Sequence, residues 1–526
     1  MLPFFKPFLK SADGAVAIIF ALATIPLLAA VGVAVDYSRV AAQRTILQQA
    51  VDVTALAVAR AMDKKTTSEL RSYAGEFLTA QLAGRFPAEI TKFVVNKDTR
   101  EIDIAAEGSM RTLLIGLFQR KDVAFNATAS AIDSLGNVEV VMALDNSGSM
   151  AGQRIIDLRA AAEKLVTILY SAPKAAERVK IGLVPFAALV NVGPGNAGAS
   201  WMDTGAQSPV HSENFQTAAN RFTLYKTTMK EVSWAGCVEA RPNGHDVLDT
   251  APSAGNASTL FVPTFAPDEP DNRSDRSDDN GYVNSYLGDE GGSCKSSDNT
   301  DKTPSVRQKK LCKYSGVKPN QAIANGTIQG PNHLCDTAPI QPLTGSQSTI
   351  TNAIKAMTAR GGTNINEGLA WAWRVISPGA PFTDGAPYSD RRVTKNIVLM
   401  SDGANQMLGI GSSNHNKSYY SAWGFSAANR LGTTSSSSST LKSKMDDRLK
   451  TLCENVKKAG TGAPDNGAGI RLYTINFDVS DSTSTKILKA CATNPDEDYF
   501  EVSANESLSA AFEKIARSIG KPRLTK

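Results

Sequence analysis

The first 236 residues of this 526-residue chain contain no cysteine, because all six cysteines lie between Cys237 and Cys491. No two cysteines have the Cys-x-x-Cys spacing and none alternates with histidine, so the sequence gives no indication of a zinc site. An even number of cysteines confined to one part of a chain is typical of disulfides formed outside the cytoplasm. Six unpaired buried thiols are the alternative.

An excess of one charge is also lacking. The 56 basic and 51 acidic residues leave a formal net charge of +5, which does not point to a nucleic-acid partner. The four histidines are scattered, and no nucleophile elbow, zinc-protease helix or phosphate loop occurs. Residues 193–198 match a dinucleotide fingerprint by letter, but no helix pattern follows that could bind a pyrophosphate. The sequence therefore predicts no enzyme.

A long run without charge is present near the N-terminus. Residues 14–35 carry no charged side chain and are long enough to span a bilayer as one helix, which can accommodate Pro26. Lys6 and Lys10 precede the run, so residues 1–13 are expected in the cytoplasm and the rest of the chain outside it. A cleaved signal peptide is the alternative, although the run is longer than a typical signal core.

Residues 36–135 are predicted to form a small pilin-like α+β region. Helix patterns cover Ser38–Met62 and Ser68–Leu82, and strand patterns cover Ile90–Asn96, Glu101–Ala106 and Val123–Ile132. On the first helix, one apolar face is expected from Ile46, Ala50, Val53 and Ala57, with Leu47, Val51, Thr54 and Val58 beside it.

After residue 135, strand and helix patterns alternate. Expected strands are Val138–Leu144, Lys180–Val190, Ile340–Leu343, Lys395–Met400, Ile470–Phe477 and Tyr499–Val502. Expected helices are Arg154–Tyr170, Ile350–Met357, Glu367–Ile376 and Ser507–Ile519. Such alternation predicts an α/β domain with a doubly wound, mainly parallel sheet over residues 136–190 and 340–520. Glu139, a charge within a buried strand, is expected at the rim of this sheet.

The pattern is interrupted between residues 191 and 339, which are rich in Gly, Ser, Asn, Asp and Pro. A structureless loop of that length does not belong inside a compact domain, so this segment is predicted to be an insertion. Its four cysteines, Cys237, Cys294, Cys312 and Cys335, allow up to two disulfides in three pairings. Asp268–Asp279 is expected to be a solvated polar loop, and the serine run Ser435–Ser439 a flexible one.

Cys453 and Cys491 lie in helical patterns on either side of the strand expected at residues 470–477. Helices that flank one strand can be close neighbours, so we expect a disulfide between these two cysteines as a hypothesis.

Side chains with oxygen ligands follow two of the predicted strands. Asp145, Ser147 and Ser149 come directly after the strand at 138–144, and Asp402 follows the strand at 395–400. Thr363 opens a helix pattern in a third segment. Open α/β sheets bind ligands beyond the carboxyl ends of their strands, where these two carboxylates would repel each other unless one is protonated or a cation lies between them. The five residues therefore predict a site for Mg²⁺, with Mn²⁺ as a possible substitute.

Helix capping by Asp145 and Ser147 is the alternative explanation of the first three residues. The order Asp-x-Ser-x-Ser, then Thr, then Asp favours the metal site, because it resembles the metal-ion-dependent adhesion site of von Willebrand factor A domains. The resemblance implies an A-type domain in which an acidic side chain of a partner protein completes the coordination of the metal.

A second resemblance lies at the N-terminus. Residues 14–18 (Gly-Ala-Val-Ala-Ile), 35–37 (Val-Asp-Tyr) and 50–52 (Ala-Val-Asp) resemble the signature of TadG-like pilus-assembly proteins of the tight-adherence (Flp pilus) system. The resemblance implies a single-pass inner-membrane protein, exported after residue 36, that helps to assemble or anchor adhesive pili with other components of the assembly machinery. Ile19 stands where related pseudopilins carry Glu, which favours an uncleaved anchor. An exported adhesin that binds a host or neighbouring-cell protein is the alternative.

Overall fold

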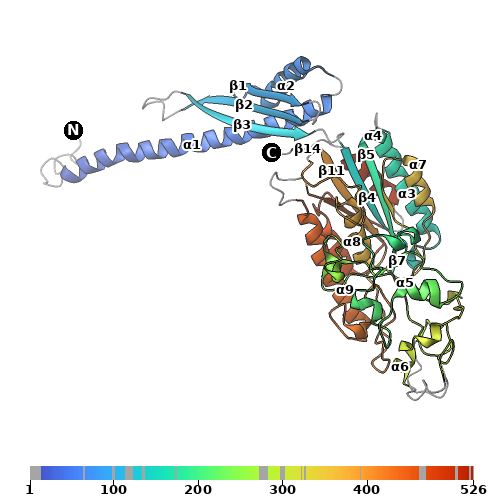
Figure 1. Ribbon diagram of the computed structural model, residues 1–526. Helices are drawn as coiled ribbons and strands as arrows, with labels where there is room; N and C mark the ends of the chain where they lie inside the picture. Colours follow the sequence, from blue (N-terminus) through green and yellow to red (C-terminus); the bar gives the residue numbers. More distant parts are fainter. Residues whose placement is uncertain are drawn as a thin grey trace. The chain divides into compact units, whose positions relative to one another are not determined.

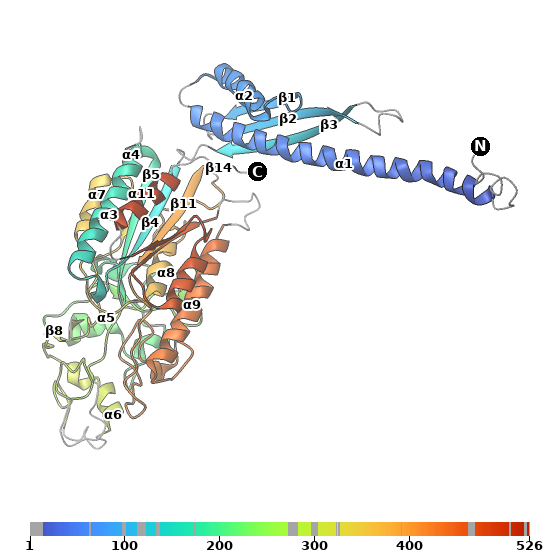
Figure 2. The same ribbon diagram turned by 180° about the vertical axis from the view of Figure 1, so that it is seen from behind.

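A computed structural model describes residues 14–62, 65–96, 101–112, 122–132, 137–171, 175–271, 282–295, 303–321, 323–324, 327–390, 392–460, 469–503, 507–519 and 523–524. The chain is of mixed α/β class and has two compact units (Figures 1 and 2). Unit 1 comprises Met1–Gly136 together with Lys521–Lys526, and unit 2 comprises Asn137–Gly520. In sequence, unit 2 is thus inserted between two parts of unit 1.

Unit 1 begins with one continuous helix, α1 (Gly14–Ala61), which covers both the predicted spanning run and the amphipathic helix predicted to continue from it. Large apolar side chains from Ile19 to Val35 are exposed along its first part, including Phe20 and Leu22. Among the described residues, this is the one helix long and apolar enough to cross a membrane.

The later part of α1 shares a hydrophobic core with α2 (Thr67–Leu82) and a four-stranded antiparallel sheet. The sheet has the order β1 (Ala88–Asn96), β2 (Glu101–Arg111), β3 (Asp122–Ile132) and β14 (Arg523–Leu524). The buried face of α1 is centred on Leu47, Val51, Ala55 and Val58. The face predicted from the sequence, which included Val53, was one position away from this one, and Val53 is exposed.

Unit 2 is built on an eight-stranded sheet. Five strands pair in parallel, in the order β13 (Tyr499–Val502), β12 (Arg471–Phe477), β11 (Val393–Ser401), β4 (Asn137–Asp145) and β5 (Val179–Phe186). Antiparallel pairs extend the sheet beyond β5 through β6 (Val190–Asn191), β7 (Cys237–Val238) and β10 (Gln341–Thr344). The single strand predicted for 180–190 is wrong: the chain reverses after Phe186, so that Val190 pairs back with it.

Both faces of this sheet are covered, because alternate side chains of β4 enter different cores. Val140 and Met142 pack with α3 (Gln153–Tyr170), α7 (Gln347–Lys355) and α11 (Leu508–Ile519). Val141 and Ala143 pack with α8 (Ile365–Ile376), α9 (Ser438–Lys458) and α10 (Ser482–Cys491). Figures 1 and 2 show α3 and α7 on one side of the sheet and α8 and α9 on the other.

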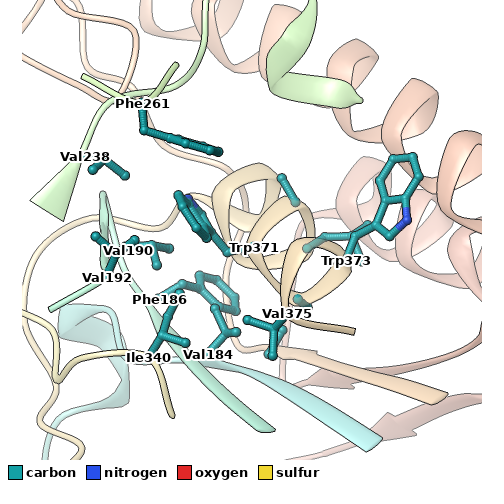
Figure 3. Packing of buried hydrophobic residues seen from close by; sticks show 14 of the residues in the cluster. Val184, Phe186, Val190, Val192, Val238, Phe261, Ile340, Trp371, Trp373 and Val375 are labelled. Atoms are coloured by element: carbon teal, nitrogen blue, oxygen red, sulfur yellow. The ribbon is translucent and has the colours of Figure 1, made fainter. Parts of the chain in front are cut away.

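Residues 191–339 contribute to one of these cores rather than lying apart from it. The Phe261 ring lies over Trp371 of α8, with 4.7 Å between ring centroids, and Phe186 and Val184 of β5 lie on the far side of Trp371 (Figure 3). Regular structure in this region is short: α5 (Arg221–Thr223), α6 (Pro304–Lys309), and the hairpin of β8 (Ile323–Ala324) and β9 (Thr327–Ile328). A further short helix, α4 (Ala175–Arg178), precedes β5.

Three disulfides are present. Cys237 is bonded to Cys335 and Cys294 to Cys312, which selects one of the three pairings that the sequence left open. Cys453 of α9 is bonded to Cys491, the last residue of α10, as expected for helices that flank β12.

Two polar segments differ from the sequence expectation. Asp268 is buried rather than solvated: its carboxylate accepts hydrogen bonds of 2.7 Å from the backbone N–H groups of Tyr286 and Leu287 and pairs with Lys313 at 2.6 Å. Residues 272–279 of the same expected loop lie outside the described residues. In the serine run, Ser435–Ser437 lie in a loop, whereas Ser438 and Ser439 form the start of α9.

Glu139 was expected at the rim of the sheet, but it is buried within it. Lys395 lies opposite Glu139 in the register of β11 with β4, and their side chains pair at 2.5 Å. The Ala386 N–H donates a second hydrogen bond of 2.8 Å to the same carboxylate. A buried charge is tolerated when it is paired and hydrogen-bonded in this way.

Lys395→Met should therefore lower the free energy of unfolding by about 3–5 kcal/mol, because it leaves the Glu139 carboxylate buried without a cation. The double variant Glu139→Gln/Lys395→Met should recover much of this loss. Urea denaturation of the wild type, the single variants Lys395→Met and Glu139→Gln, and the double variant closes the double-mutant cycle. If the double variant is no more stable than Lys395→Met, the loss comes from packing and not from the charge.

Candidate functional site

The parallel register of β4 and β11 brings two chain segments together at the carboxyl edge of the sheet. Met400 is the register partner of Leu144, so Ser401 and Asp402 arrive beside Asp145. The Ser401 hydroxyl donates a hydrogen bond of 2.6 Å to Asp145 Oδ2, and the Ser147 N–H donates one of 2.8 Å to Asp145 Oδ1. Asp145 is fully buried and both of its oxygens are held in place.

The two serine hydroxyls connect this turn to Asp402. Ser147 Oγ and Ser149 Oγ are 3.0 Å apart, and the Ser149 hydroxyl donates a 2.7 Å hydrogen bond to Asp402 Oδ1. Neither Asp145 nor Ser147 caps α3, which begins at Gln153 after the N-cap Gly152, and Ser147 makes no capping hydrogen bond to the 3₁₀ turn Gly148–Met150. The capping alternative therefore does not account for them.

Thr363 reaches the same edge from the loop between α7 and α8. The Gly148 N–H donates to the Gly361 carbonyl at 2.8 Å, and the Gln406 N–H donates to the Thr363 carbonyl at 2.8 Å. A Cβ atom placed on Gly403 would lie 3.2 Å from Thr363 Oγ1 and 4.0 Å from Ser149 Oγ. The lack of a side chain at Gly403 thus leaves space between oxygens from two loops.

Burial raises the pKa of Asp145 from 3.8 to about 7, and the negative charge of Asp402 adds to the rise. The hydrogen bonds from Ser401 and Ser147 act in the opposite direction but are weaker. A second negative charge is therefore costly at this edge, which is a condition that a cation would relieve.

Arg154, in the first turn of α3, is a charged residue that the sequence analysis missed. Its guanidinium donates a 2.9 Å hydrogen bond to Asp402 Oδ2 and one of 2.6 Å to Asp478, which follows β12. A cation in the first turn of a helix is unfavourable with respect to the helix dipole, so its presence there is a signal for a nearby acidic partner. Arg154 therefore binds Asp402 Oδ2, while Oδ1 of the same carboxylate accepts the hydrogen bond from Ser149.

The donor set fits a hard divalent cation. It consists of two carboxylates and three hydroxyls, all oxygen, from three loops at the carboxyl edge of the sheet. The side-chain amide of Asn146, in the same turn, is buried, and neither its oxygen nor its nitrogen has a hydrogen-bond partner. Among the described residues no group of three His, Cys, Asp or Glu side chains could hold a metal, so binding here would depend on the hydroxyls.

Comparison with known families gives one match. Residues 14–61 match the family model of TadE/G-like Flp pilus-assembly proteins, which confirms the predicted relationship for the N-terminal helix. A search of curated proteins found no match.

Solved structures with low similarity include pilus proteins. The vWF domain of the type V pili tip protein Mfa5 from Porphyromonas gingivalis is 13% identical, with a TM-score of 0.31 over 73% of this chain and 95% of that one. The pilus adhesin RrgA from Streptococcus pneumoniae is 12% identical, with a TM-score of 0.33 over 84% of this chain and 50% of that one. The pilus adhesin SpaC from Lactobacillus rhamnosus GG is 11% identical, with a TM-score of 0.29, and this chain spans about a third (34%) of its length.

The raised pKa of Asp145 predicts a pH dependence of stability in the presence of EDTA. A carboxyl group whose pKa is about 7 in the folded state and about 3.8 in the unfolded state binds more protons when folded between those pH values. Its contribution to the unfolding free energy therefore falls as pH rises from about 4 to about 7. Asp145→Asn should flatten this fall, measured by urea denaturation between about pH 5 and about pH 8.

Burial also raises the pKa of Glu269 to about 7, which adds a fall of the same sign. That contribution is common to wild type and variant, so the difference between the two curves isolates Asp145. Parallel curves would show that Asp145 does not titrate in this range.

Arg154→Gln should destabilise the protein more without a divalent cation than with one. Without metal, it removes the partner of the buried Asp402 and should lower the free energy of unfolding by about 1–3 kcal/mol. With Mg²⁺ in excess, the loss should shrink, because a bound cation would replace the missing positive charge. Thermal unfolding with EDTA and with Mg²⁺ measures both, and Lys164→Gln, an exposed lysine on the same helix, is the control for the charge change.

Proposed function

We propose that this chain is a membrane-anchored, exported factor that assembles or anchors a Flp-type adhesive pilus, and that it has no enzymatic role. We further propose that unit 2 is a von Willebrand factor A-type domain with a doubly wound sheet, which binds a partner protein through a metal ion. Support for the pilus role comes from the family match of residues 14–61 and from the apolar helix that contains them.

The observation that carries the binding role is the meeting of oxygen atoms from three loops at one sheet edge. Asp145, Ser147, Ser149, Thr363 and Asp402 would hold Mg²⁺, or Mn²⁺, directly or through water. When bound there, the ion would supply a coordination position for an acidic group of the partner. Ser401 and Arg154 would orient the two carboxylates.

The chain itself supports export of both units. Basic residues Lys6 and Lys10 precede the apolar helix, which favours an N-terminus in the cytoplasm and a single pass through the inner membrane. Three disulfides in unit 2 are typical of a compartment outside the cytoplasm.

Replacing the chromosomal copy by Asp402→Asn should abolish surface pili while pilin levels stay normal, because the neutral amide weakens the cation site without removing the protein. Asp447→Asn, an exposed aspartate on α9, is the control and should leave pili intact. Electron microscopy counts the pili, and immunoblotting measures pilin and the factor itself. Normal pili with poor attachment in the Asp402→Asn strain would favour the exported adhesin instead.

The same two variants test the metal directly. Calorimetry on the full-length protein should detect Mg²⁺ binding by wild type and Asp447→Asn, and binding weakened at least tenfold by Asp402→Asn. Absence of divalent-cation binding to the wild-type protein would exclude the metal-dependent mode of attachment.

A further inference from the structure

A cavity of 640 Å³ opens in unit 2 beside the loops that carry the candidate metal ligands. Gly148, Gly361 and Gly362 form one wall. Each of these glycines is adjacent in sequence to a candidate ligand or one residue removed from it, since Gly148 lies between Ser147 and Ser149 and Gly362 precedes Thr363. The volume falls within the roughly 300–1,000 Å³ typical of sites that bind a ligand.

The glycine wall is set by close backbone approaches. Gly361 has a φ of +81°, a conformation that favours glycine. A Cβ atom on Gly148 would lie 3.3 Å from the Gly361 carbonyl oxygen, and one on Gly362 would lie 2.9 Å from Gln406 Oε1. The same close contacts that join the loops at the sheet edge therefore shape the mouth of the cavity.

Other parts of the lining come from two segments that lie outside the alternating strands and helices. Residues 191–339 supply Val283 and Leu334, and residues 403–436 supply Met407, Leu408 and Tyr419. Leu408 is 42% exposed although it is a large apolar residue, so the cavity presents apolar surface to solvent.

These walls are braced by covalent and ionic contacts. The disulfide of Cys335 with Cys237 follows Leu334 directly and fixes its segment to β7. Glu239, next to β7, is buried and accepts hydrogen bonds from Tyr420 and Arg430 of the second segment. A wall held in this way is suited to a preformed site rather than to one that assembles around its ligand.

The described residues that line the cavity present no charge that would repel an acidic partner. None of the described residues that line it is Asp or Glu, and Arg360 is the one with a permanent charge, its Nη1 being 3.7 Å from Asp336 Oδ1. His333, also in the lining, is buried, and burial lowers its pKa, so its ring is uncharged near neutral pH. A carboxylate at the glycine wall would thus meet no like charge from the cavity, and the candidate cation site lies next to it.

We infer that the cavity binds an extended segment of the partner protein in which a large apolar side chain lies within two residues of an acidic one. The acidic group would approach the metal ligands, while the apolar side chain would enter the cavity between Leu334, Leu408 and Met407. The inference rests on the proposed metal-dependent function and adds the sequence type of the partner to it. An apolar contact of this kind distinguishes partners that share the acidic group.

Selection from a random heptapeptide phage library on the full-length protein in lipid nanodiscs, with Mg²⁺ present, tests this directly. Enriched peptides should contain Asp or Glu with Leu, Ile, Phe or Met within two positions, and EDTA should abolish their capture. Enrichment of acidic peptides without an apolar preference would overturn the inference and leave the proposed function standing. If no acidic peptide is enriched, or if capture survives EDTA, the proposed metal-dependent binding is itself wrong.

Fluorescence anisotropy with one enriched peptide then locates the apolar contact. Leu408→Ser should weaken binding roughly tenfold, whereas the control Leu248→Ser, at a leucine of similar exposure (39% against 42%) outside the cavity lining, should not. Ala188 is half-buried and lines the cavity, so Ala188→Phe would fill part of the cavity and should weaken binding by at least as much. If Leu408→Ser and Ala188→Phe keep the wild-type affinity for the peptide while Asp402→Asn loses it, the peptide binds at the candidate metal ligands but outside the cavity. That result would overturn the inference.

Discussion

Two carboxylates that follow adjacent parallel strands are the constraint on which the rest of unit 2 depends. The register of β4 with β11 fixes Asp145 and Asp402 at one edge of the sheet, in a setting where water cannot screen them, because both are buried. Their repulsion is offset by the Ser401 hydroxyl and the Ser147 N–H at Asp145 and by the Arg154 guanidinium at Asp402. A proton on Asp145 near neutral pH serves the same end. Each of these contacts offsets part of the repulsion that a single divalent cation between the two carboxylates would offset.

The Arg154 ion pair also limits how a cation could be accommodated. Its guanidinium occupies Asp402 Oδ2, so Oδ1, which accepts the Ser149 hydrogen bond, faces the other candidate ligands. Because Asp478 shares Arg154, part of its charge is already compensated, and the ion pair would not by itself repel a cation strongly. Ser149 would only have to rotate its hydroxyl hydrogen away to act as a ligand through oxygen.

Much of this arrangement could be predicted from the sequence, because it follows from local pattern and from the rule that parallel strands end at one edge. The apolar runs gave most of the strands of unit 2, and the residues directly after two of them gave the candidate ligands. Arg154 could not be found in this way, since its partner Asp402 lies 248 residues away and the pairing depends on tertiary structure. Glu139 was misplaced for the same reason: its cation, Lys395, is set by strand register. The reversal after Phe186 carries no Gly or Pro, so the apolar run through Val190 looked like one strand.

Residues 191–339 show why composition misleads about burial. The segment is rich in polar and small residues, yet its aromatic side chains enter the core on α8, and guanidinium groups cover those rings: Arg374 and Arg241 each lie within about 5 Å of the Phe261 centroid (5.1 and 4.8 Å). Arg221 and Arg430 both pair with the buried Glu239. Cation–ring contacts and internal ion pairs thus replace part of the aliphatic packing that sequence periodicity detects.

Recognition of one acidic partner among many would need more than a bound cation. A cation attracts any carboxylate, so a metal ion at the sheet edge would by itself distinguish poorly between acidic partners. Selectivity among them would have to come from the protein surface beside the ion. In unit 2 that surface is supplied by residues 191–339 and 403–436, which are joined to each other by Glu239 with Tyr420 and Arg430. The contacts of the second segment with a ligand-bearing loop include a backbone hydrogen bond, from the Gln406 N–H to the Thr363 carbonyl. Side chains such as Leu408 can therefore change without disturbing the β4–β11 register that positions the carboxylates. Attraction and selectivity would then reside in different parts of one site, each free to vary without the other.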